Sequence, residues 1–338
     1  MNAVEFDNVS IVFGDTPARA LPLMDKGQTR SEIQASTGQI LGVHDCSLSV
    51  AEGEILVLMG LSGSGKSTLL RGVNALNPVV RGEVRVRDGN TMTSVTNADA
   101  ATLRRLRLSN IAMVFQAFGL LPWRTVRDNV GLGLELGGQT AEQRRAKVDE
   151  QLALVNLSQW ADRKVGELSG GMQQRVGLAR AFVTDAPILL MDEPFSALDP
   201  LIRARLQDEL LDLQTKLKRT IIFVSHDLDE AFKIGNRIAL MEGGRIVQVG
   251  TAREIIANPS SEYVADFVAH MNPLGVLTAR DVMQPGFGGG PAVDCEMPVK
   301  EVMEQLATET VLTVTEAGKP IGIIQAGGLM AKLINPRG

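Results

Sequence analysis

The chain has 338 residues, a formal net charge of −5 and 44% hydrophobic residues, of which few are aromatic. This length favours roughly two domains with cores built from aliphatic side chains. Acidic and basic residues are interspersed rather than gathered in blocks, which argues against a nucleic-acid partner bound by a strongly basic face.

The N-terminus and the cysteines predict a soluble intracellular protein. The first residues, MNAVEFDNVS, have neither the basic nor the apolar part of a secretory signal. No apolar run approaches the ~20 residues that are needed to span a bilayer. The two cysteines, Cys46 and Cys295, are far apart in sequence and are expected to be reduced thiols.

Three short apolar runs predict central strands of a parallel sheet that is covered on both faces. They occupy residues 54–59, 188–191 and 220–224, and each is too short for a buried helix. Each run ends in polar residues, and in open α/β sheets ligands bind at the carboxyl ends of the strands. We therefore expect the three strand ends to form one site.

The first run leads into a phosphate-binding loop. Residues 60–67, GLSGSGKS, fit the pattern G-x-x-x-x-G-K-[ST] between a strand and a helix. The glycines let backbone N–H groups face phosphates, and the positive end of the helix adds to the attraction. Lys66 is expected to reach the β- and γ-phosphates, and Ser67 to bind Mg²⁺. The predicted binding residues for a nucleoside triphosphate are Gly60, Ser62, Gly63, Ser64, Gly65, Lys66, Ser67 and Thr68.

The region of residues 97–181 is rich in helical spacing. Two of its helices are expected to begin at the caps Asn97 and Thr140. Gln116 follows a short apolar strand pattern, which carries no functional signal by itself. The β pattern returns at residues 237–249, where a glycine-containing turn predicts a hairpin.

The ends of the second and third runs supply groups suited to hydrolysis. Asp192 fits the carboxylate that supports Mg²⁺ in proteins with a phosphate loop. Glu193, the next residue, is the expected general base for an attacking water. His226 follows the third run, where a neutral imidazole would hydrogen-bond the γ-phosphate or that water. A purely structural or surface histidine is the alternative.

A second glycine-rich turn lies in LSGGMQQR, residues 168–175. It has the composition of an anion-holding loop but contains no lysine, and alone it is typical of a helix cap. Together with the phosphate loop, Asp192, Glu193 and His226, it makes the chain resemble the ATP-binding cassette (ABC) ATPases, whose signature it matches. The resemblance extends over about residues 2–271.

This resemblance implies a homodimer in which two cassettes pair head to tail. Each ATP would lie between the phosphate loop of one subunit and the signature of the other. Ser169, Gly170 and Gly171 would then bind nucleotide in trans, at a helix beginning near Met172. Asp199 belongs to the loop that would couple the two sites.

The resemblance also implies an α/β fold with a P-loop (RecA-like) core, a helical subdomain at about residues 97–181 and an antiparallel β-subdomain. Gln116 would sense Mg²⁺ and the membrane partner. Residues 116–123 would form the groove that receives a helix of the transmembrane permease.

An insertion at about residues 15–40 separates Phe13 from the phosphate loop. Phe13 is the best candidate for stacking on adenine, with a role in the strand core as the alternative. The insertion resembles the extra segment of quaternary-amine importers, which serve glycine betaine, proline betaine and choline uptake in bacteria. The segment beginning Asn272-Pro273-Leu274 looks most like choline importers, so choline is the first expectation and glycine betaine or proline betaine the alternative.

A second domain is expected at residues 272–338, because the composition of the sequence changes near residue 272. Helical spacing at 299–308, two strand patterns at 310–324 and a helix at 328–333 give an α-β-β-α order. This α+β module resembles one cystathionine-β-synthase (CBS) repeat, with residues 276–283 as a possible leading piece. A single copy would either pair with that of another subunit or only pack without sensing.

The expected function is ATP hydrolysis that powers quaternary-amine import, with ATP and Mg²⁺ as cofactors. The implied partners are a second copy, a membrane permease and a periplasmic or extracellular substrate-binding protein, with the homodimer peripheral at the cytoplasmic face of the membrane. The alternative is a non-transport cassette acting on nucleic acid or ribosomes, which typically has two cassettes or a coiled-coil insertion. A module without turnover is disfavoured, since Lys66, Asp192, Glu193 and His226 are all present.

Overall fold

The computed structural model describes residues 1–116, 119–196, 198–269, 274, 276–286 and 288–334. Backbone contacts divide the chain into two compact units: residues 1–226 with 241–246, and residues 227–240 with 247–338. The predicted domain boundary near 272 lies in the stretch 270–273, outside the described residues. Among the described residues, no helix is long and apolar enough to cross a membrane.

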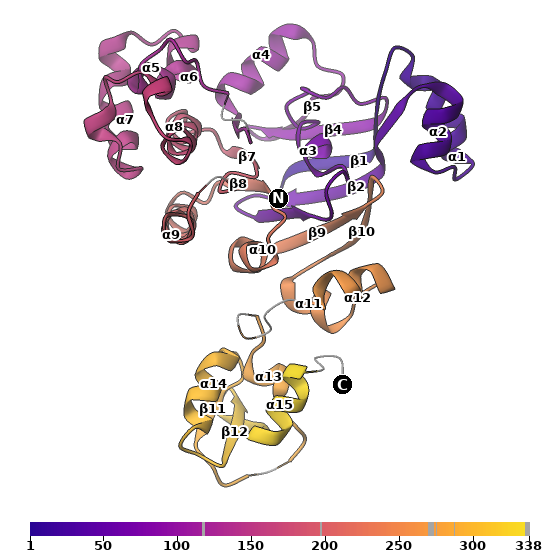
Figure 1. Ribbon diagram of the computed structural model, residues 1–338, viewed down its shortest axis with the longest axis vertical. Coiled ribbons are helices and arrows are strands. Elements are labelled where there is room, and N and C mark those ends of the chain that lie inside the picture. Colours follow the sequence, from indigo (N-terminus) through magenta and orange to yellow (C-terminus); the bar gives the residue numbers. More distant parts are fainter. Residues whose placement is uncertain (117–118, 197, 270–273, 275, 287, 335–338) are drawn as a thin grey trace. The chain divides into compact units, whose positions relative to one another are not determined.

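Parallel strands form the centre of the first unit (Figure 1). They lie in the order β3 (Ile55–Met59), β8 (Thr220–Val224), β7 (Ile188–Asp192) and β6 (Ile111–Val114). Every residue of β3, β7 and β8 is buried, as strands covered on both faces require. The three apolar runs are therefore confirmed as central strands.

A second, antiparallel sheet precedes the phosphate loop in sequence and continues after it. Its order is β2 (Ile40–Ala51), β1 (Asn2–Phe13), β4 (Arg81–Asp88) and β5 (Thr91–Ser94). Buried and exposed residues alternate along most of β2, which is typical of a sheet with one solvated face. This sheet supplies the antiparallel β-subdomain that the family resemblance implies.

The insertion folds into short helices between β1 and β2. These are η1 (Pro17–Ala20), α1 (Leu21–Asp25) and α2 (Arg30–Thr37). A small buried cluster fixes them to the sheet, formed by Val12, Ala20, Met24, Ile33 and Leu41.

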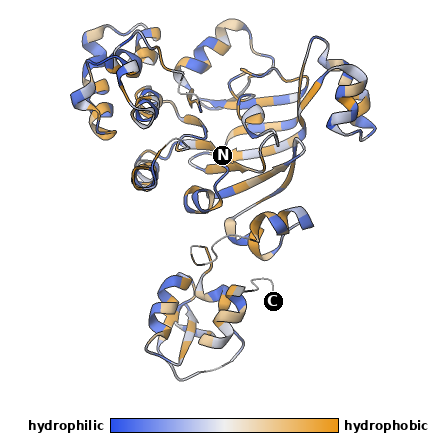
Figure 2. Cartoon of the chain, viewed as in Figure 1, coloured by the Kyte–Doolittle hydropathy of each residue, from blue (hydrophilic) through white to orange (hydrophobic). Residues whose placement is uncertain are grey.

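Most of the region 97–181 is helical, as predicted, although β6 also lies within it. The helices are α4 (Ala100–Ser109), α5 (Val126–Val130), α6 (Leu132–Leu136), α7 (Ala141–Leu154) and α8 (Gly170–Phe182), with 3-10 turns η2 (Ser158–Trp160) and η3 (Val165–Glu167). The stretches of these helices carry both hydrophobic and hydrophilic residues (Figure 2). Thr140 caps α7 in a capping box, which confirms that prediction.

The predicted cap of α4 is wrong. Asp99, and not Asn97, caps this helix, because the Asp99 carboxylate accepts the backbone N–H of Thr102 at 2.7 Å. The Asn97 side chain instead donates to Glu83 at 3.2 Å.

Helix α9 (Pro200–Leu217) belongs to the first unit, and helix α10 (Leu228–Ile234) belongs to the second. The predicted hairpin is confirmed as β9 (Arg237–Glu242) and β10 (Arg245–Gly250), joined by the turn at Gly243 and Gly244. Helices α11 (Ala252–Ala257) and α12 (Glu262–Val268) follow.

The C-terminal segment has its own small sheet and core. Strand β12 (Val311–Glu316) pairs in parallel with β11 (Ala292–Asp294) and in antiparallel fashion with β13 (Lys319–Gln325). Helices α13 (Ala279–Val282), α14 (Val299–Leu306) and α15 (Ala326–Ile334) accompany the sheet. The predicted α-β-β-α order is confirmed, while β11 was not predicted. The resemblance to a CBS repeat stays a prediction.

Candidate nucleotide-binding site

The polar ends of the central strands meet in one cavity of about 740 Å³. Most of its lining comes from the loop after β3, from the ends of β6, β7 and β8, and from the insertion. The lining residues are Phe13, Arg30, Gln34, Ile40, Leu41, Gly42, Ser62, Gly63, Gly65, Lys66, Ser67, Thr68, Gln116, Glu193 and His226. The expectation of a single site at the strand ends is thus met in the structure.

The phosphate loop leads directly into α3 (Lys66–Leu70). Gly65 has φ +103°, and a Cβ there would lie 2.6 Å from the Gly42 carbonyl oxygen, so only glycine fits. Ser62 and Gly63 line the cavity, whereas Gly60 and Ser64 do not. Ser64 is buried, with a hydroxyl that has no protein hydrogen-bond partner.

The ammonium group of Lys66 lies beside the loop that precedes it. It donates to the carbonyl oxygens of Gly60 at 2.8 Å and Leu61 at 3.0 Å. Burial lowers the pKa of Lys66, and the charges of Glu193 and Asp192 oppose that effect. Lys66 lines the cavity, where its side chain can meet a phosphate group.

Asp192 supports the loop from behind. Its side chain is fully buried, and its carboxylate accepts from the Ser67 hydroxyl at 2.6 Å and from Arg71 at 2.8 Å. Charge-assisted hydrogen bonds of this kind keep a buried carboxylate in place. Asp192 does not line the cavity and reaches it through Ser67.

The oxygen groups near the loop suit a magnesium ion, which prefers hydroxyl and carboxylate ligands. Ser67 presents a hydroxyl to the cavity, with the Asp192 carboxylate behind it. The Gln116 side chain donates through its nitrogen, so its amide oxygen remains as a further ligand.

Glu193 is the centre of a second group at the cavity. The Gln116 amide nitrogen donates to Oε2 of Glu193 at 2.9 Å, and Nδ1 of His226 lies 3.5 Å from the same oxygen. The Glu193 side chain is 18% exposed and that of His226 64%. Glu193 has φ +48°, a left-handed conformation that is uncommon for this residue type and is frequent at functional sites. The structure thus brings Gln116, Glu193 and His226 together at the cavity.

Phe13 lies at the cavity wall. It pairs with Ile40 across β1 and β2, and both side chains line the cavity. The ring is half-buried and therefore has one side in the wall of the sheet. Its place in the cavity wall fits stacking on a base, and that role stays a prediction.

The signature turn lies elsewhere. Ser169 caps α8 through its hydroxyl, which accepts the backbone N–H of Met172 at 3.4 Å. The helix begins at Gly170, two residues before Met172, directly after the Ser169 cap. Among the described lining residues of the cavity, neither Ser169 nor Gly170 nor Gly171 appears.

Asp199 also acts as a helix cap in the structure. Its carboxylate accepts the backbone N–H of Ile202 at 3.1 Å at the start of α9. It does not line the cavity. Residue 197 of the predicted coupling loop lies outside the described residues.

The ABC transporter family profile matches residues 43–196. The glycine betaine/proline betaine transport ATP-binding protein ProV of Salmonella typhimurium is 44% identical over 345 residues, with 99% of this chain and 84% of that protein covered. The chain belongs to the quaternary-amine importer family of ABC transporter ATP-binding subunits. It is an ATPase of the ABC transporter type, and the family binds ATP.

A solved structure supports the fold. The ATP-binding cassette MJ0796, a dimer in a post-hydrolysis state bound to ADP and Pi, is similar with a TM-score of 0.63 and 30% identity. The match covers 74% of this chain and 99% of that cassette.

The similarities favour glycine betaine and proline betaine over choline. The choline transport ATP-binding protein OpuBA of Bacillus subtilis is 40% identical, but over only 67% of this chain and 58% of that protein. The expectation of choline rested on the short C-terminal segment beginning Asn272-Pro273-Leu274, whose first two residues lie outside the described residues. The alternative named from the sequence is therefore the better supported one.

Five residues that line the cavity were not predicted from the sequence: Arg30, Gln34, Ile40, Leu41 and Gly42. Arg30 and Gln34 lie four positions apart on α2 of the insertion, and both line the nucleotide cavity. The available signal was their i, i+4 spacing behind Thr29, which caps the helix. That spacing places both residues on one face of the helix, but it does not indicate that this face lines the nucleotide cavity.

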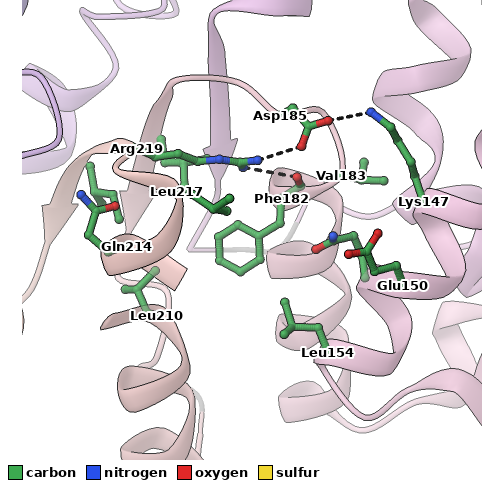
Figure 3. Close-up of a pocket in the computed structure, with 13 residues that line it drawn as sticks. Lys147, Glu150, Leu154, Phe182, Val183, Asp185, Leu210, Gln214, Leu217 and Arg219 are labelled. Atoms are coloured by element: carbon green, nitrogen blue, oxygen red, sulfur yellow. Dashed lines mark hydrogen bonds and ion pairs between the residues drawn. The ribbon is translucent and has the colours of Figure 1, made fainter. Parts of the chain in front are cut away.

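A second cavity, of about 290 Å³, lies between α7, the end of α8 and α9 (Figure 3). Its lining is largely apolar, and in Figure 3 Lys147 and Arg219 both point to Asp185, at 2.6 and 2.9 Å. It contains none of the predicted phosphate-binding or catalytic residues. It is therefore not the nucleotide site of this cassette.

Proposed function

We propose that this ATPase powers the import of glycine betaine and proline betaine through a separate membrane permease. The observation that carries the proposal is the group around Glu193, beside a complete phosphate loop. The substrate class rests on the similarity to ProV across 99% of the chain.

In this proposal, different residues of the cavity bind the phosphates, accept the proton of the water and hold Mg²⁺. Lys66 and the loop N–H groups neutralise the β- and γ-phosphates. Glu193 accepts the proton of the attacking water, while Gln116 and His226 hold the carboxylate and the water in place. Bound Mg²⁺ would be held by Ser67 and Gln116 with Asp192 behind them, and it would neutralise charge on the phosphate oxygens.

The active form that we propose is a head-to-tail homodimer. Ser169 and Gly170 are exposed at the start of α8, away from the cavity of their own chain. The N-terminus of a helix attracts phosphate, so this turn suits the nucleotide of a second copy. The similar cassette MJ0796 is a dimer, which supports this arrangement. Asp199, in this proposal, belongs to the loop between the two sites.

A groove beside Gln116 offers a place for the permease. A cavity of about 390 Å³ is lined by Leu76, Met113, Phe115, Leu132, Leu136 and Arg180, among others. Leu76 and Leu136 are large apolar side chains that remain about half exposed. Arg180 of α8 donates to the Gly119 carbonyl oxygen at 2.6 Å, which links the signature helix to the wall of this groove.

We infer that a helix of the permease lies in that groove. An exposed apolar concavity next to a polar site is typical of an interaction surface. The homodimer would then be peripheral at the cytoplasmic face of the membrane. A substrate-binding protein on the other side would select the amine, so the amine does not contact this chain.

The test compares uptake by cells that carry the native chain with uptake by cells that carry only Glu193→Gln. Labelled glycine betaine and labelled choline are supplied separately, in a strain without other importers of these amines. Collapse of glycine betaine uptake supports the proposal. Collapse of choline uptake alone would restore the choline assignment, and no change in either would overturn the role in quaternary-amine import.

A further inference from the structure

Helix α2 of the insertion is held firmly at the rim of the nucleotide cavity. Thr29 and Glu32 form a capping box at its start. Ile33 is completely buried in the small cluster that fixes the insertion to the sheet. One face of the helix is thus anchored, and Arg30 and Gln34 lie at the cavity.

Arg30 reaches from this helix to the phosphate loop. Its Nη1 donates to the Gly63 carbonyl oxygen and its Nη2 to the Gly42 carbonyl oxygen, both at 2.5 Å. Gly63 belongs to the loop, and Gly42 lies in the strand behind it. One side chain of the insertion therefore ties the loop to the sheet.

Arg30 forms no ion pair with a carboxylate in the described part of the chain. Its Nη atoms donate to carbonyl oxygens, and its Nε is buried without a hydrogen-bond partner. Burial lowers its pKa, but a guanidinium stays protonated in proteins. A half-buried cation without an acidic partner is unfavourable unless an anion approaches it.

The second polar group that this face presents to the cavity is the exposed Gln34, one helical turn after Arg30. In the described structure its side-chain amide makes no hydrogen bond, and it shares the cavity lining with Phe13 and Ile40. An amide can both donate and accept, which suits the polar edge of a nucleoside. The face of α2 thus offers one cation and one amide to the same cavity.

We propose that the insertion is a working part of the nucleotide site. Arg30 is a positioning residue that fixes the phosphate loop through Gly63 and adds positive charge for a nucleoside triphosphate, and Gln34 contacts the nucleoside. The inference deepens the proposed function, because it rests on ATP binding in this cavity. In this proposal, a segment outside the phosphate-loop motif takes part in binding a nucleoside triphosphate.

The first experiment measures ATP affinity by calorimetry, and kcat and KM for ATP, with the purified full-length chain. Arg30→Ala should weaken ATP binding about tenfold, since the cavity loses a positive charge and the phosphate loop loses its contact through Gly63. KM should rise in parallel, with kcat changed less than about twofold. Arg30→Lys should recover part of the affinity, because it keeps the charge but not the two-pronged contact. Lys26→Ala, an exposed cation of the same insertion, is the matched control and should bind ATP as the native chain does.

A second pair of variants covers the case in which Arg30→Ala does not fold. Gln34→Glu adds a negative charge at the cavity and should weaken ATP binding severalfold. Ser31→Glu adds the same charge to the same helix outside the cavity lining, and should leave the affinity unchanged.

Native ATP affinity in both Arg30→Ala and Gln34→Glu would overturn the inference. So would a lower unfolding temperature of Arg30→Ala with unchanged ATP affinity, since that would show a purely structural contact. If the native chain itself neither binds nor hydrolyses ATP, the proposed function fails. If the native chain binds ATP and the variants bind it equally well, only this inference fails.

Discussion

Two turns of this ATPase combine glycine with serine and open a helix, yet they differ in almost every other respect. The turn before α3 encloses a buried lysine and lines the nucleotide cavity. The turn before α8 has no lysine, is largely exposed and lies away from the cavity of its own chain. In the head-to-tail dimer that we propose, similar local chemistry serves one nucleotide from two chains. There the phosphate loop binds the nucleotide of its own chain, and the signature binds that of the second copy.

The largest effect is expected from Glu193→Gln, which acts beside the first turn. The amide has nearly the same shape but cannot accept a proton, so hydrolysis should fall by roughly 10²–10⁴-fold. ATP affinity should remain, because the phosphate-binding residues are unchanged. Steady-state phosphate release and an ATP titration measure the two quantities. Hydrolysis at the native rate would show that Glu193 is not the base.

Ser169→Arg tests the second turn. A long cation at this exposed position should keep two copies apart, and hydrolysis should then fall by about 10²-fold, as when a donor to the transition state is lost. ATP binding by a single chain should be unaffected. Light scattering with ATP, in the Glu193→Gln background, should show dimers only when Ser169 is native.

The matched control is Ser158→Arg, which places the same side chain at another exposed serine of the helical region. Dimers should persist in that variant. Loss of ATP binding by the single Ser169→Arg chain would contradict the account of the signature as a contact in trans.

A pair of glycine substitutions sharpens the comparison of the turns. Gly65→Ala places a Cβ 2.6 Å from a carbonyl oxygen at φ +103°, so the free energy of unfolding should fall by about 1–3 kcal/mol. Gly170 has open space around its Cα, and Gly170→Ala should raise that free energy by up to about 1 kcal/mol. Urea unfolding of the two variants measures both changes. Equal destabilisation would mean that the second turn is as constrained as the first.

The sequence predicted the parts of this site that short motifs specify. The apolar runs, the phosphate loop and the residues at the strand ends are local in sequence, and parallel pairing brings them together. What the sequence could not predict depends on contacts between distant residues. The hydrogen bond from Arg30 to Gly63 joins residues 33 positions apart, and the sequence near Arg30 does not indicate which residue it contacts.

The cap of α4, the exact start of α8 and the strand β11 were not predicted correctly, for reasons that lie in the sequence around each of them. Asn97 and Asp99 are both good caps, and only the geometry of the first turn shows that Asp99 is used. The exact start of α8 at Gly170 could not be predicted, because glycine disfavours helices and only the Ser169 cap in the structure shows that Gly170 and Gly171 are helical. Strand β11 has three residues, too few for a periodic pattern.

The smallest effect is expected from Ser169→Ala, and it separates the two roles of this serine. The hydroxyl accepts the N–H of Met172 at a long 3.4 Å, so loss of the cap should lower the free energy of unfolding by only about 0.5–1 kcal/mol. If the hydroxyl also contacts the nucleotide of a second copy, hydrolysis should fall severalfold while the ATP affinity of the single chain stays native. Ser261→Ala removes the corresponding cap of α12 and provides the control, since it should change stability by a similar amount without changing hydrolysis. A stability loss in Ser169→Ala with native hydrolysis would reduce this serine to a cap, and the contact in trans would then rest on the backbone of Gly170 and Gly171 alone.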